Sequence, residues 1–138
     1  MVNKKCKNYL QSEVLSATKD KIIQLVYDKV LTTLNLAVKN LEENNIVEVH
    51  NNIIKAEMII FHLMNHLDFK AGEISKNLFN IYEYSLNQLK DANVKKDIEM
   101  VKNVINIFKE LNEAWKHINV KNVKGKESKE NEALNYSV

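Results

Sequence analysis

The sequence predicts an all-α protein, an antiparallel up-down-up-down four-helix bundle. The 138-residue chain has no proline and only two glycines, too few turn residues for a sheet of short strands. Apolar residues recur at helical spacing in four segments. Short connections between these segments favour antiparallel neighbours. We expect the bundle to occupy residues 16–118, between a short N-terminal strap of residues 1–15 and a disordered C-terminal tail of residues 119–138.

The first long helix is predicted to run from Lys19 to Glu43, behind the N-cap candidates Ser16 and Thr18. Its apolar residues cover an arc of roughly 240° on a helical projection, whereas a surface helix needs only a little over 100°. This helix is therefore either buried on nearly all sides, or part of its apolar surface is left for a partner.

The second helix is predicted over Ile46–Leu67, with an apolar arc of roughly 260°. His62 and His66 lie on its narrow polar strip, where we expect them to be solvated. Asp68–Gly72 should form the following turn, because glycine adopts a left-handed conformation at little cost.

The third helix is predicted over Glu73–Asp91, with a narrower apolar arc of roughly 160°. A connection over Ala92–Lys96 follows. Asp97 is a suitable cap for a fourth helix from Ile98 to about Ile118.

The aromatic residues divide by their position on these projections. Tyr82, Phe108 and Trp115 lie at core-facing positions, where packing is the usual role of an aromatic side chain. Tyr27 and Tyr84 lie nearer the borders of their apolar stripes, which makes them the better candidates for a binding surface.

Composition argues against several classes of function. The formal net charge is +2 and every basic side chain other than histidine is lysine, alternating with acidic residues. Nucleic-acid sites depend heavily on arginine and on clustered positive charge, so we expect no nucleic-acid function. No apolar run has transmembrane length, so we expect no membrane insertion. A single cysteine, Cys6, makes no internal disulfide, and a reducing cytoplasmic location fits best.

We find no set of residues that predicts catalysis or a metal or cofactor site. His62 and His66 are one turn apart, but Leu63 follows the first, so the hydrolytic His-Glu-x-x-His pattern is absent. The Glu-x-x-His pairs of di-iron bundles are absent too, and Glu48, Glu83, Glu110 and Glu113 fall on outward arcs. Cys6 lies between lysines in the polar leader, where an incidental thiol is expected.

The remaining signal is the excess apolar surface. It suits a groove in which helical segments of a partner dock. It also suits a broad dry interface between the first two helices, or a homodimer. Pattern alone leaves these alternatives open.

Four stretches, taken together, resemble the flagellar export chaperone family FliS. They are YLQSEVLSAT with IIQLVYD (residues 9–18 and 22–28), KAEMIIFHLMNHLD (55–68), ISKNLFNIYEYSLNQLKDAN (74–93), and KDI with LNEAWK (96–98 and 111–116). Two positions depart from the family pattern: Lys19 replaces the usual proline and Lys29 replaces the usual glycine after Tyr-Asp.

The resemblance implies a cytoplasmic chaperone, not an enzyme. It would bind the disordered C-terminal segment of flagellin, prevent premature polymerisation, and deliver flagellin to the export gate of the flagellar type III secretion system. A co-chaperone is a further possible partner. The alternative is a homodimeric helical-bundle interaction protein with no export client.

The resemblance and the helical projections together suggest site residues. In the strap, Tyr9, Leu10 and Val14 would cover the groove or contact the export gate, with Tyr9 as the main gate contact. The flagellin-binding groove is assigned to Ile22, Leu25, Val26, Leu34, Ile60, Met64, Leu78, Tyr82 and Leu89.

Overall fold

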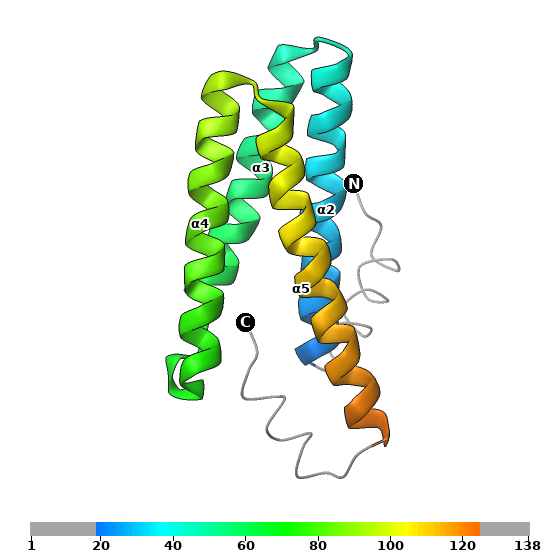
Figure 1. Cartoon of the computed structure of the whole chain (residues 1–138), viewed down its shortest axis with the longest axis vertical. Coiled ribbons are helices and arrows are strands. Elements are labelled where there is room, and N and C mark those ends of the chain that lie inside the picture. The colour runs from blue at the N-terminus through cyan, green and yellow to red at the C-terminus, as the bar shows by residue number, and fades with distance from the viewer. Residues whose placement is uncertain (1–18, 125–138) are drawn as a thin grey trace, which may run out of the picture.

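The computed structural model describes residues 19–124, and side chains within that range from residue 21 to residue 117. Its elements are α2 (Lys19–Glu42), α3 (Ile46–Asn65), the short 3-10 helix η1 (Phe69–Ala71), α4 (Glu73–Lys95) and α5 (Ile98–Lys124). Successive helices run in opposite directions (Figure 1), and α2 and α4 each pack against both α3 and α5. The predicted all-α antiparallel bundle is confirmed. The predicted strap of residues 1–15 lies outside the described residues.

The helix ends follow from local chemistry. Asn45 caps α3, because its side-chain oxygen accepts a hydrogen bond from the backbone N–H of Glu48. After α3, the Asp68 carboxylate accepts a hydrogen bond from the backbone N–H of Lys70 and begins η1. Gly72 then has a φ of +81°, which confirms its predicted role in the turn.

Two helices are longer than predicted. α4 continues through Ala92, whose side chain is fully buried, and ends at Lys95. Lys96 follows as its C-cap, in a left-handed conformation with a φ of 51°. Asp97 then caps α5 as predicted, accepting hydrogen bonds from the backbone N–H groups of Glu99 and Met100. α5 continues past Ile118 to Lys124, since residues 119–124 contain no glycine or proline, so these six residues are helical and not part of a disordered tail as predicted. Residues 125–138 of the predicted tail lie outside the described residues.

The core lies along the axis of the bundle and draws on all four helices. Its buried apolar side chains include Ile23, Tyr27, Val30, Leu34, Val49, Ile53, Ile60, Leu63, Tyr82, Leu89, Val101, Val104, Phe108 and Trp115. The predicted core positions of Tyr82, Phe108 and Trp115 are confirmed. Burying each large apolar side chain contributes about 1.5–3 kcal/mol.

The prediction for Tyr27 was wrong. Its side chain is fully buried rather than part of a binding surface. The Tyr27 hydroxyl lies 2.6 Å from the Tyr82 hydroxyl and accepts a hydrogen bond of 3.1 Å from the indole N–H of Trp115. A tyrosine at the edge of an apolar stripe can be buried when other helices supply polar partners for its hydroxyl, and those partners are distant in the sequence.

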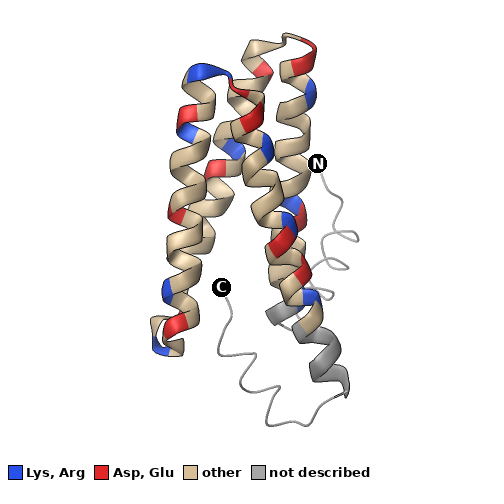
Figure 2. Cartoon of the chain, in the orientation of Figure 1, with Lys and Arg blue, Asp and Glu red and all other residues tan. Residues whose placement is uncertain are grey.

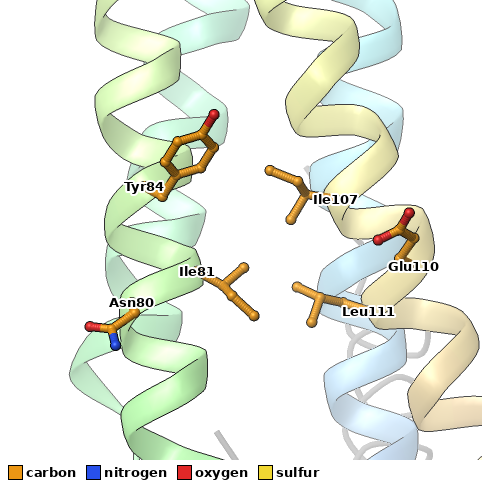
Figure 3. A pocket seen from close by; sticks show the side chains of 6 residues that line it. All are labelled: Asn80, Ile81, Tyr84, Ile107, Glu110 and Leu111. Atoms are coloured by element: carbon orange, nitrogen blue, oxygen red, sulfur yellow. The ribbon is translucent and has the colours of Figure 1, made fainter.

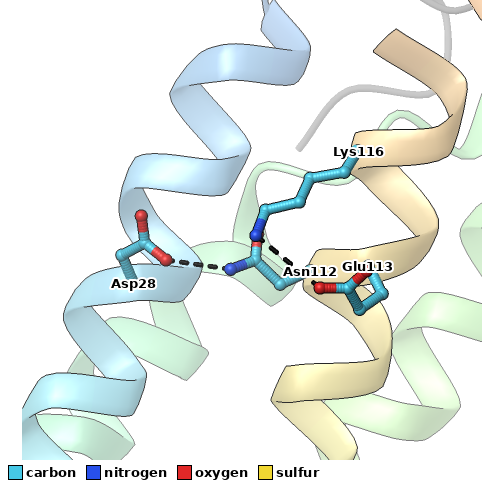
Figure 4. A network of polar contacts seen from close by, with 4 residues as sticks. All are labelled: Asp28, Asn112, Glu113 and Lys116. Carbon is cyan, nitrogen blue, oxygen red and sulfur yellow. Dashed lines mark hydrogen bonds and ion pairs between the residues drawn. The ribbon is translucent and has the colours of Figure 1, made fainter. Parts of the chain in front are cut away.

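Charged residues of both signs occur along all four helices (Figure 2). The outward positions predicted for Glu48, Glu83, Glu110 and Glu113 are confirmed. Figure 4 shows two polar contacts in the C-terminal half of α5: Asp28 of α2 accepts a hydrogen bond of 2.8 Å from the Asn112 side chain, and Lys116 pairs with Glu113 at 3.6 Å. The second pair is exposed, and such pairs contribute at most about 1 kcal/mol.

Candidate functional site

Large apolar side chains remain exposed on the first two described helices, where the sequence shows its widest apolar arcs. These are Leu25 and Leu36 on α2 and Ile46, Val47, Met58 and Phe61 on α3. Leu25 is 46% exposed and Phe61 55% exposed. Four helices therefore do not enclose all the apolar surface that α2 and α3 carry, and the uncovered part is available for contact with another chain.

An apolar groove lies between α2 and α3, with a volume of about 540 Å³. We call it the α2–α3 groove. It is lined by Ile22, Leu25, Val26 and Lys29 from α2, by Ile59, His62 and Leu63 from α3, and by His66, the C-cap of α3. Each set follows a spacing of three, four and seven residues, so each comes from a single face of its helix. Two neighbouring helices with apolar residues along their facing edges leave a shallow trough between them. Such a trough suits the docking of a third, amphipathic helix.

The structure places the nine predicted groove residues in three environments. Ile22, Leu25 and Val26 line the α2–α3 groove. Met64 is half-buried against the core and is not among the residues that line the groove. The other five, Leu34, Ile60, Leu78, Tyr82 and Leu89, are buried inside the bundle. Helical projections identify apolar arcs, but they do not say which part of an arc faces a neighbouring helix.

Sequence reasoning did not assign five residues that line the groove: Lys29, Ile59, His62, Leu63 and His66. A signal for them was present in the spacing, because Ile59, His62, Leu63 and His66 repeat the pattern of Ile22, Leu25, Val26 and Lys29 on the next helix. Polar residues at the ends of both patterns are typical of the rim of a binding surface.

Two smaller hollows lie elsewhere on the described bundle. Between α4 and α5, Ile81, Tyr84, Ile107 and Leu111 point toward one another across a pocket of about 390 Å³ (Figure 3), with Asn80 and Glu110 also lining it. Tyr84 is exposed there, as predicted for a surface residue.

The third hollow, of about 270 Å³, lies between α3 and α4 beside the exposed Met58 and Phe61. Its other lining residues are Glu57, His62, Leu86 and Lys90. Burial raises the pKa of the Glu57 carboxyl, and the positive charges of Lys90 and His50 partly offset that rise.

The polar chemistry of these sites is limited. No group of three or more histidine, cysteine or acidic side chains suitable for a metal ion occurs among the described residues. His62 and His66 are exposed, with ring centroids 6.1 Å apart, and Nδ1 of His66 donates a hydrogen bond to the backbone carbonyl of His62. In the part of the chain that the structure describes, no helix is long and apolar enough to span a bilayer.

The fold and the groove define a class: a helical bundle whose apolar trough suits the docking of another helix. Comparison with known proteins gives the family. Residues 1–122 match the family model described as "Flagellar protein FliS". The chain belongs to the FliS family of flagellar secretion chaperones, which confirms the resemblance drawn from the sequence.

Relatives from three bacteria support this assignment. The flagellar secretion chaperone FliS of Salmonella typhimurium is 32% identical over 81% of this chain and 84% of its own length. The Vibrio cholerae protein is 31% identical over 79% and 81%, and the Bacillus subtilis protein is 30% identical over 78% and 80%. Similarity therefore extends along most of each chain, not over a single helix.

Proposed function

We propose that this chain is a cytoplasmic export chaperone for flagellin. In this proposal the disordered C-terminal segment of flagellin folds into a helix in the α2–α3 groove, is kept from polymerising, and is delivered to the flagellar type III export gate. The observation that carries the proposal is an open apolar groove on a bundle of the FliS family.

The energetics of coupled folding and binding suit a temporary complex. A segment that folds on binding typically buries about 1,000–3,000 Å², and its ordering costs about 2–5 kcal/mol of the interaction energy. The apolar side chains that line the groove, such as Ile22, Leu25 and Val26, supply the contact surface. The ordering cost keeps the affinity moderate, so that the client can be released at the gate.

The remaining site assignments are part of the proposal. Tyr9, Leu10 and Val14 act in the strap, with Tyr9 as the contact for the export gate. Ile22, Leu25 and Val26 belong to the groove, whereas Met64 packs against the core outside its lining. The buried Leu34, Ile60, Leu78, Tyr82 and Leu89 would reach a client only if the helices separated. A co-chaperone would bind a face away from the groove.

A titration with a flagellin C-terminal peptide tests the proposal. We expect the peptide, unstructured alone, to gain helicity by circular dichroism on binding. Leu25→Asn should weaken binding about tenfold, because an apolar contact worth about 1.5 kcal/mol is lost. Val94→Asn, which changes an exposed side chain at the end of α4, is the matched control and should bind normally. Absence of binding to the unmodified protein would rule the proposal out.

The alternative function, a homodimeric interaction protein, draws support from one observation. Met58 and Phe61 are exposed beside the α3–α4 hollow, away from Leu25, and a second copy would cover them. Sedimentation separates the two functions. A monomer that forms a complex only with flagellin favours the chaperone, whereas a tight dimer unaffected by flagellin favours the alternative.

A further inference from the structure

The α2–α3 groove has an uneven charge. Its lining includes one cationic side chain, Lys29, and two imidazoles, His62 and His66, but no acidic side chain. The basic groups lie on both walls, since Lys29 belongs to α2, His62 belongs to α3 and His66 is the C-cap of α3. Lys55 lies four residues before Ile59 and so continues the same face of α3.

Three described acidic residues close to this lining in sequence have other neighbours. The Asp68 carboxylate accepts a hydrogen bond from the backbone N–H of Lys70. Asp28 precedes Lys29, but its carboxylate accepts the hydrogen bond from Asn112 of α5. Glu57 lines the hollow between α3 and α4, where Lys90 is its principal charged neighbour. The Lys29 side chain is exposed and takes part in no ion pair with any residue between 21 and 117. Its positive charge is therefore available to a docked chain.

The histidines add a second basic edge. A carbonyl oxygen only accepts hydrogen bonds, so Nδ1 of His66 carries the proton that bonds to the carbonyl of His62, and Nε2 of His66 has no partner within the described residues. A carboxylate placed beside an imidazole favours its protonated, cationic form. His62 also lines the α3–α4 hollow. Lys29 and His66 line the α2–α3 groove and neither of the other two hollows.

We propose that the α2–α3 groove selects amphipathic helices that carry Asp or Glu beside their apolar ridge, and that Lys29 is the main specificity-determining residue. The inference rests on the proposed function, in which the groove binds a client helix. The apolar walls supply most of the affinity, and the basic rim sets orientation and preference between clients.

Three designed peptides provide the test. Each is an amphipathic helix of about five turns with leucines at i, i+3, i+4 and i+7, and the positions beside that ridge are all Glu, all Gln or all Lys. Affinity is measured by fluorescence anisotropy at low and high salt. We expect the Glu peptide to bind about two- to fivefold more tightly than the Gln peptide, the Lys peptide to bind most weakly, and these differences to shrink at high salt.

Variants then assign the preference to Lys29. Lys29→Gln should reduce the preference for the Glu peptide, and Lys29→Glu should reverse it in favour of the Lys peptide. Both should fold, because the side chain is exposed; should Lys29→Glu not fold, Lys29→Gln carries the test. Lys102→Gln removes an exposed lysine on α5 and is the matched control, with the preference unchanged.

The inference is overturned if the three peptides bind equally, if none binds, or if both Lys29 variants keep the original preference. These outcomes differ from failure of the proposed function. Binding of the flagellin peptide without any charge preference would leave the chaperone function in place and remove only the role of Lys29. A charge preference without flagellin binding would do the reverse.

Discussion

Tyr27 and Tyr82 connect helices that are diagonal in the bundle, α2 and α4. Trp115 adds α5 through its hydrogen bond to Tyr27, and the Phe108 ring packs against both tyrosines, edge-on to Tyr27 and stacked on Tyr82. Each of these polar groups has a partner, although the cluster is almost fully enclosed. The network fixes the relative positions of three helices, because hydrogen bonds are directional whereas apolar contacts are not.

Tyr27→Phe should destabilise the protein by about 1–3 kcal/mol. The substitution keeps the ring but leaves the Trp115 N–H and the Tyr82 hydroxyl buried without a partner. Urea unfolding followed by circular dichroism measures the change. Tyr84→Phe removes an exposed hydroxyl and should change stability by less than about 0.5 kcal/mol. Equal losses in the two variants would contradict the role of the buried network.

Stability should fall as the pH rises from about 10 to 12. Burial is the main cause that raises the pKa of Tyr27 to about 12, and it also raises the pKa of Tyr82. Below pH 10 the folded and unfolded chains both keep these protons. Between pH 10 and 12 the unfolded chain loses protons that the folded chain retains, so unfolding becomes easier by about 1.4 kcal/mol per pH unit for each tyrosine.

Urea unfolding at a series of pH values measures this slope. Lysine side chains also titrate in the alkaline range, so the comparison that matters is between the unmodified protein and Tyr27→Phe. The variant should lose stability less steeply, because one of the two buried hydroxyls is gone. Identical slopes would show that the buried tyrosines do not control alkaline unfolding.

At the scale of elements, the turn between α3 and α4 depends on Gly72. Its φ of +81° and ψ of −135° are available to glycine at little cost and strained for other residues. Gly72→Ala should therefore cost about 1–3 kcal/mol of stability. An added Cβ would meet no atom within 4 Å, so the loss would come from backbone strain and not from a clash.

Thermal unfolding monitored by circular dichroism tests this expectation. Asn44→Gly is the control, because it introduces a glycine where Gly72→Ala removes one. Asn44 also has a positive φ, of 58°, which glycine would adopt without strain. That variant should be within about 0.5 kcal/mol of the unmodified protein or slightly more stable. A harmless Gly72→Ala would show that the turn adjusts freely.

The sequence predicted the elements better than the site. Helix starts at Ile46, Glu73 and Ile98 agree with the structure, because caps and breaks are local signals. The predicted ends at Asp91 and about Ile118 fall short of Lys95 and Lys124, because a helix can continue beyond its apolar pattern where the chain has no glycine or proline.

The groove was harder to predict because packing decides which part of a wide apolar arc is covered. Leu34 and Leu25 both lie on the apolar arc of α2, yet Leu34 is fully buried and Leu25 is about half exposed. The difference depends on where α3 and α5 lie against α2, and no pattern within one helix contains that information. The family, by contrast, was recognisable from short stretches spread along the chain.

At the scale of the whole molecule, the side-chain hydrogen bonds that join α3 to other helices lie near the N-terminal end of α3. Asn52 donates a hydrogen bond to Asn40 of α2, and His50 bonds to Asn93 of α4. Both contacts lie near the loop at residues 43–45. From Ile53 to Asn65, α3 forms no hydrogen bond to another helix among residues 21–117, and this is the end that borders the α2–α3 groove.

α3 is thus joined to its neighbours by hydrogen bonds near Asn52 and by apolar packing beside Ile59 and Leu63. We therefore expect α3 to hinge about the Asn52 end, like one arm of a pair of tweezers. Because apolar contacts are not directional, this end of α3 can shift by small amounts without breaking a hydrogen bond. Amide hydrogen exchange should accordingly be faster at residues 59–65 than at residues 49–53, and a bound helix should slow it. Uniform exchange along the arm would exclude the hinge. A hinged α3 would let the α2–α3 groove widen or narrow, so that it could bind helices with larger or smaller side chains.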